Sequence, residues 1–117
     1  MREPVKDTGR LLHILESIDN IYEFADRKTF EQIEGDKMRF FAIVYQLVVI
    51  GEAANMLTKE FRHEHPQTPW REIVSMRNFI VHGYNVVDKT EVWSVIENDL
   101  GPLKQQIEQY ISELECE

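Results

Sequence analysis

FFAIVYQLVVI, residues 40–50, is a run in which apolar side chains surround a helix instead of following one stripe. The apolar pattern extends beyond this run and predicts a long helix from about residue 37 to 61. Such a helix is buried on more than one side, either in the centre of a bundle or against a second subunit. Small residues just after the run would let another helix approach closely, and these are Gly51, Ala53 and Ala54.

Helical periodicity also precedes this segment. Leucine and isoleucine recur every three or four residues from about residue 7 to 26, which predicts an amphipathic first helix. Residues 29–33 are expected to be a short helical or irregular segment. Gly35-Asp36 then supplies a break with an N-cap for the long helix.

More helices are expected after it, because the remaining sequence carries helix start signals. The signals are a threonine cap before a proline, an aspartate with capping-box spacing to a glutamate, and a Gly-Pro pair: Thr68-Pro69, Asp88 with Glu91, and Gly101-Pro102. The first of these helices should cover residues 69–82, and Gly83 is well placed to end it in a left-handed turn. No period-two alternation favours a strand.

The composition fits a single soluble domain over residues 1–117. With 43% hydrophobic and 29% charged residues the chain can bury one core, and no apolar run reaches the ~20 residues that cross a bilayer. The polar start lacks a signal-peptide pattern, and Cys116 is the single cysteine. We therefore expect an all-α, antiparallel bundle of four to five helices, located in the cytoplasm and without a membrane partner.

Charge is spread unevenly along the chain. The net charge of −8 argues against a protein that wraps nucleic acid non-specifically. Residues 37–84, however, hold six Lys/Arg against four Asp/Glu and three of the four histidines, whereas acidic residues dominate both flanks. A polyanion would be tolerated in the middle of the chain and repelled elsewhere.

The segment Arg77-Asn78-Phe79-Ile80-Val81-His82-Gly83-Tyr84 brings a cation, an imidazole and a phenol together at the predicted helix end. Arginine presents a fork of donors to phosphate oxygens, and histidine moves protons near neutral pH. On an ideal helix Arg77 and His82 point about 140° apart, so they would meet through the reach of arginine, a loosened helix end, or a two-fold dimer. The alternative is structural: Arg77 pairs with a carboxylate, His82 caps the helix and Tyr84 packs in the core.

This segment resembles the RX4-6HXY signature of HEPN-domain ribonucleases, and the wider sequence looks like the HepT-like group of prokaryotic toxins within them. Further matches follow one another in the order and spacing of that group: Ile50-Gly51-Glu52-Ala53-Ala54, Glu60-Phe61-Arg62, His65-Pro66, Pro69-Trp70-Arg71-Glu72-Ile73, Met76-Arg77-Asn78 and Asn98-Asp99-Leu100. One departure is that Tyr45-Gln46 stands where the group carries Arg-Asn, which removes a cation from the second helix.

The resemblance implies a homodimer whose two signature motifs face each other in a cleft and cleave RNA without a metal or other cofactor. Arg77 would hold the phosphate, His82 would act as general base or general acid, and Asn78 and Tyr84 would support substrate or phosphate contacts. In this group the tyrosine of the motif is also adenylylated by a partner, a minimal nucleotidyltransferase antitoxin. Tyr84 occupies that position.

Two assignments near the motif remain open. Glu52 lies on a helix predicted to be buried, where a carboxylate needs a cationic partner. It either orients Arg77, or it is solvated or pairs with another cation such as Arg71. The overall function also has two interpretations: an endoribonuclease toxin, or a non-catalytic dimeric module that partners a nucleotidyltransferase and only binds nucleotide or phosphate. A metal site is not expected, because the spacing of His63 and His65 is poor for shared coordination.

Overall fold

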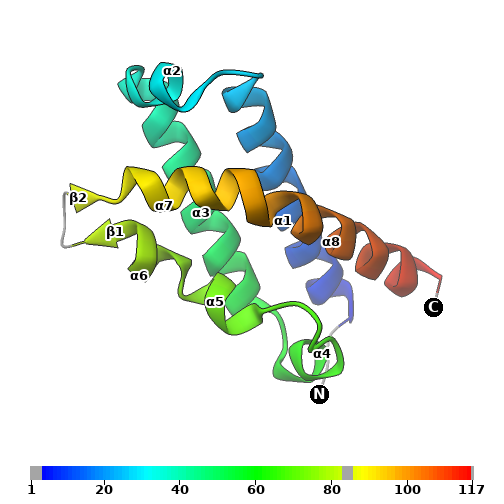
Figure 1. The fold of residues 1–117 in the computed structure, drawn as a ribbon. Helices are drawn as coiled ribbons and strands as arrows, with labels where there is room; N and C mark the ends of the chain where they lie inside the picture. The colour runs from blue at the N-terminus through cyan, green and yellow to red at the C-terminus, as the bar shows by residue number, and fades with distance from the viewer. Residues whose placement is uncertain (1–3, 83–85, 117) are drawn as a thin grey trace.

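The computed structural model describes residues 4–82 and 86–116, except for the side chains of Pro4, Val5 and His82. Its long helices are α1 (Pro4–Ala25), α3 (Lys37–Met56) and α8 (Leu100–Glu115), and α1 packs along both of the others (Figure 1). The shorter helices lie between them: α2 (Phe30–Glu34), α4 (Lys59–Glu64), α5 (Trp70–Val74), α6 (Met76–Ile80) and α7 (Lys89–Ser94). The prediction of an all-α helical bundle is confirmed.

Helix α3 is the central helix of the core, as its apolar pattern predicts. It starts at the expected N-cap, where the Asp36 carboxylate accepts a hydrogen bond of 3.2 Å from the Arg39 amide. By length and composition alone α3 could also cross a membrane. Core helices pass the same test, however, and one face of α3 is buried against α1, α5 and α6. The buried residues of α3 are Phe40, Ile43, Val44, Leu47, Ile50, Gly51, Ala53 and Ala54.

Gly51 allows the close approach that the small residues predict. A Cβ atom built on it would lie 3.1 Å from the carbonyl oxygen of Ile73, which is backbone and has little room to move. The absence of a side chain therefore lets α5 rest directly on α3, and this contact sets the position of the segment that leads to α6.

The predicted helix over residues 37–61 is wrong in its length, because α3 ends at Met56 and α4 begins at Lys59. The break is made by Asp7, a buried carboxylate of α1. It accepts hydrogen bonds from the Thr58 amide (2.9 Å) and hydroxyl (2.8 Å). Since the Thr58 amide is used in this way, it does not continue the α3 ladder, and the Thr58 hydroxyl oxygen instead caps α4 by accepting from the Phe61 amide.

The predicted helix over residues 69–82 also differs. It is divided at Ser75 into α5 and α6, and it ends at Ile80. Two short strands follow, β1 (Val81–His82) and β2 (Val86–Val87), which pair antiparallel with His82 opposite Val86. Two-residue strands are too short to produce an alternating pattern, so no local pattern predicts them. The turn expected at Gly83 lies outside the described residues.

Helix α7 begins at Lys89, and Asp88 is its N-cap as predicted, with the Asp88 carboxylate accepting from the Glu91 amide at 3.0 Å. The helix ends at Ser94. A π-helical turn, η1 (Val95–Asp99), joins it to α8, and the Leu100 amide donates to the Val95 carbonyl five residues back. Pro102 has no N–H to donate to the preceding turn, so a local change of hydrogen-bond pattern there keeps the two segments in one rod.

An aromatic cluster fixes the loop before α5 to α8. The Phe61 ring stacks on His65 at 4.1 Å between centroids and meets Tyr110 edge-on at 5.7 Å. The Trp70 indole donates to the His65 carbonyl at 2.9 Å, and the Tyr110 hydroxyl bonds to Thr68. Burial raises the pKa of Tyr110, so this phenol stays neutral and the cluster is a rigid support for α4 and α5.

Candidate functional site

Arg77 and Asn78 lie on the exposed part of α6. The same short helix is anchored by Met76 (6% exposed) and Ile80 (0% exposed), which are buried in the core. Within the described residues Arg77 forms no ion pair with a carboxylate. The alternative in which Arg77 pairs with a carboxylate of its own chain therefore finds no support among the described residues. The exposed guanidinium is accessible to an anion.

His82 stands beyond the helix end. The Val81 amide closes α6 by donating to the Arg77 carbonyl, and the backbone of His82 belongs to β1. The ladder to Val86 and a hydrogen bond of 2.6 Å from the Asp88 amide to the Ile80 carbonyl hold this extended segment beside the start of α7.

The 140° separation expected from an ideal helix consequently does not apply to Arg77 and His82. The helical progression of 100° per residue ends at Ile80, and the backbone of Val81 and His82 is extended. Tyr84, the third member of the motif, and the side chain of His82 lie outside the described residues.

Glu52 is exposed, so among the alternatives left open for it the structure favours a solvated carboxylate. It lines a groove between α1 and α3 together with Arg10 and His13. Within the described residues it forms an ion pair with neither Arg77 nor Arg71. The reason is its position on α3, where it faces away from α5 and α6. With no cationic partner among the described residues, the Glu52 carboxylate is solvated.

The face of α3 that carries Glu52 is otherwise apolar. Phe41 and Tyr45 are 54% and 64% exposed, and Val48 and Val49 are half-buried. These residues, with Met38 and Met56, recur at three- and four-residue steps, and we call them the α3 stripe. The departure at Tyr45-Gln46 fits this arrangement, because Tyr45 joins the stripe and Gln46 accepts a hydrogen bond from Asn20 of α1 at 3.4 Å.

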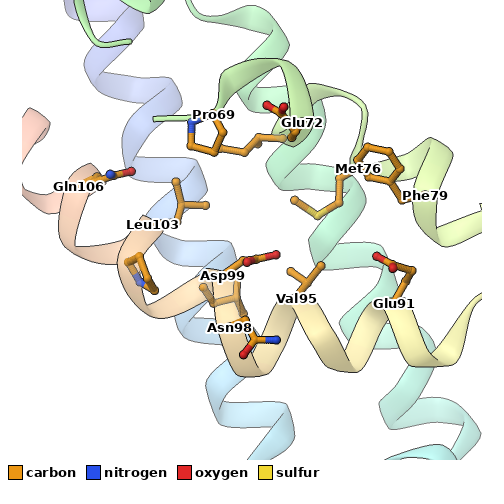
Figure 2. Close-up of a pocket in the computed structure, with 13 residues that line it drawn as sticks. Pro69, Glu72, Met76, Phe79, Glu91, Val95, Asn98, Asp99, Leu103 and Gln106 are labelled. Carbon is orange, nitrogen blue, oxygen red and sulfur yellow. The ribbon is translucent and has the colours of Figure 1, made fainter. Parts of the chain in front are cut away.

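A separate groove of about 380 Å³ lies between α5–α6 and the α7–η1–α8 rod, with Met76, Phe79, Val95 and Leu103 among the apolar side chains that line it. Figure 2 shows the carboxylates of Glu72, Glu91 and Asp99 around it. We call it the acidic groove. Three carboxylates repel phosphate, so a polyanion that reaches Arg77 must come from another side.

Comparison with known proteins places these features in a family. A family model described as Ribonuclease HepT-like matches residues 14–110. A "Probable ribonuclease HepT" of Thermococcus cleftensis is 37% identical over 81% of this chain and 86% of its own length. A protein of Methanocaldococcus jannaschii whose name marks it as an inferred RNase is 32% identical over 84% of this chain and 90% of its own. No solved structure matches the chain with comparable significance.

Proposed function

Since the chain belongs to the Ribonuclease HepT-like family and its activity is accordingly the endoribonucleolytic cleavage of RNA, we propose that Arg77 and His82 are the residues that carry out this cleavage. In this proposal the reaction needs no metal ion and takes place at a cleft between two copies of the chain. Membership in a ribonuclease family favours the enzyme over the non-catalytic module. The observation that supports these site residues most is the exposed Arg77, which forms no ion pair among the described residues. It lies four residues before the start of β1, the strand that carries His82.

The proposed chemistry uses the ribose as the nucleophile. His82 takes the proton of the 2′-hydroxyl, the 2′-oxygen attacks phosphorus, and the bond to the 5′-oxygen breaks after that oxygen receives a proton from a second acid. The products are a 2′,3′-cyclic phosphate and a 5′-hydroxyl. Arg77 binds the non-bridging oxygens, where charge builds up in the transition state, and Asn78 orients Arg77 or the substrate.

A dimer would supply both proton-transfer groups. One His82 can act as base while the His82 of a second copy acts as acid, and a two-fold axis places two such groups across one cleft without further residues. The α3 stripe supports association, because contiguous exposed apolar surface marks a protein contact. The unpaired Glu52 on the same face would then find its cationic partners in the second copy or in the cleft.

Metal independence is tested by incubating the purified protein with labelled RNA in a chelator. The described residues hold no group of three or more His, Cys, Asp and Glu side chains placed for a metal ion, and the proposed chemistry needs none. We expect cleavage at the same rate with EDTA as with Mg²⁺, and 2′,3′-cyclic phosphate ends by mass spectrometry. Loss of activity in EDTA that Mg²⁺ restores would contradict the mechanism.

We further propose that the protein is the toxin of a pair whose antitoxin is a minimal nucleotidyltransferase. The partner would transfer AMP from ATP to the Tyr84 hydroxyl and release pyrophosphate. Tyr84 follows His82 by two residues, so the added phosphate would repel the substrate phosphate and occupy the space beside the catalytic base. The support for this step is the motif position of Tyr84.

Co-expression with such a nucleotidyltransferase should add the mass of one AMP to the chain, and peptide mapping should locate it on Tyr84. The Tyr84→Phe variant lacks the acceptor oxygen and should stay unmodified under the same conditions. Tyr22→Phe is the control, because Tyr22 is an exposed tyrosine outside the motif and its loss should leave the modification intact. An adduct on Tyr84→Phe would show that the acceptor is another residue.

A further inference from the structure

A second groove lies where α4 and α5 meet the start of α6, and cations line it. Its charged residues are Lys59, Arg62 and Arg71, together with His63, which is charged when protonated. Trp70, Val74 and Ser75 complete the lining. We call it the cationic groove. The groove is therefore locally positive, although the net charge of the chain is −8.

These cations are not neutralised from within the described part of the chain. None of Lys59, Arg62 and Arg71 forms an ion pair with a described carboxylate. The Nε atom of Arg62 is enclosed and donates to no acceptor among the described residues. An enclosed donor without an acceptor is costly and rare. The neighbouring carboxylates do not line the groove, although they lie on the same helices: Glu60, Glu64 and Glu72.

The groove is held in shape by packing. Trp70 forms one wall, is 7% exposed and is fixed by its hydrogen bond to His65. The α5 backbone rests on Gly51 of α3. In Figure 1 α4 and α5 lie together at one end of α3, and α2 lies at the other end. Packing therefore fixes the backbone and the Trp70 wall of the groove, which reduces the entropy that an anion must remove when it binds.

We propose that the cationic groove binds the phosphate backbone of the RNA substrate away from the scissile bond, which rests on the proposed function of Arg77 and His82. Ser75 lines the groove and precedes Arg77 by two residues, so their Cα atoms are no more than about 7.6 Å apart. A single strand can therefore pass from the groove to the motif. The acidic groove on the other side of α5 and α6 would repel that strand, which gives it one direction of approach.

The test is RNA binding as a function of salt concentration, measured by fluorescence anisotropy with a labelled single strand in a His82→Ala background. Each phosphate contact contributes about 0.7 to the slope of log K against log salt for single strands. Lys59→Ala with Arg71→Ala should lower that slope by about 1.4 and raise Kd by roughly ten-fold at about 0.1 M salt. Both residues are exposed, so the variant should fold.

A matched control removes the same charge elsewhere. Lys28→Ala with Lys37→Ala changes the net charge equally near the α2 end of α3, and its slope should equal that of the parent protein. Equal slopes in the parent, the groove variant and the control would contradict the proposal that the cationic groove binds RNA. An equal decrease of the slope in the control variant would contradict it as well. Arg62→Lys is a second probe: the charge and the slope should remain, while Kd rises because the planar fork is lost.

The readout does not depend on turnover, so the two proposals fail separately. Cleavage of RNA by the parent chain with unchanged slopes in the groove variants would remove the cationic groove and leave Arg77 and His82 in place. A slope that depends on the groove, in a chain that never cleaves RNA, would remove the catalytic proposal and leave the groove as a binding site.

Discussion

His82→Ala should lower the rate constant for RNA cleavage by roughly 10²- to 10⁴-fold, the contribution of a positioned general acid or base. Binding of the RNA should change much less, because phosphate contacts are made by cations. Single-turnover cleavage of a labelled RNA with enzyme in excess separates the two effects. Any residual rate should no longer show the pH dependence that a titrating imidazole gives the parent enzyme.

Arg77→Ala should lower the same rate constant by about 10²- to 10³-fold, since a charge that stabilises the transition state is lost. Arg77→Lys should recover only part of the activity, because a point charge replaces a two-pronged donor. Lys37→Ala is the control for loss of one exposed cation elsewhere on the chain, and it should cleave normally. Unchanged cleavage in both His82→Ala and Arg77→Ala, with melting curves equal to the parent, would remove the proposed mechanism.

Tyr45→Glu should convert a dimer into a monomer and abolish cleavage with it. Tyr45 is 64% exposed at the middle of the α3 stripe, so the folded monomer can solvate a carboxylate there. In a two-fold dimer formed through the α3 stripe, the same change would bury two carboxylates, one from each copy, in apolar surface. One uncompensated buried charge costs about 3–5 kcal/mol, so even one of the two weakens the dimer about 10²- to 10⁴-fold. Sedimentation equilibrium at micromolar concentration measures the loss, and cleavage assays follow it.

Gln105→Glu is the matched control for this charge. Gln105 is an exposed residue of α8 and lies outside the α3 stripe, so the variant should remain dimeric and active. Rescue of Tyr45→Glu by high protein concentration would strengthen the link between assembly and activity. A parent chain that sediments as a monomer while it cleaves RNA would contradict the dimer cleft.

Local signals predicted most of the fold. The N-caps at Asp36 and Asp88 and the start of the long helix at residue 37 are as the sequence indicates, because a cap is an interaction between a side chain and an amide three residues away. The apolar run of α3 likewise predicted that this helix is central to the core. It could not tell which of its other apolar residues stay exposed, since this depends on the elements that pack around the helix.

The motif residues were also proposed from the sequence, but their structural surroundings could not be. Arg77 and Asn78 stand out by their spacing to His82, whereas the end of α6 at Ile80 depends on pairing between β1 and β2 and on the Asp88 amide. Glu52 shows the same limit. Its sequence neighbours are small and apolar, which suggests burial, yet it faces outward beside Arg10 and His13.

The sequence by itself determined the helical class and the capped helix starts at Asp36 and Asp88, because these follow from interactions within about one helical turn. It also supplied the residues that we propose act on phosphate. Only the tertiary structure decided where the helices end and which charged side chains lie together in one groove. Asp7 interrupts the helix between α3 and α4 by accepting a hydrogen bond from the Thr58 amide, 51 residues away in the sequence. Arg62 and Arg71 lie on separate helices, and only the packing of those helices on Gly51 and the Tyr110 cluster makes them neighbours in one groove. Such contacts join distant segments and leave no local pattern.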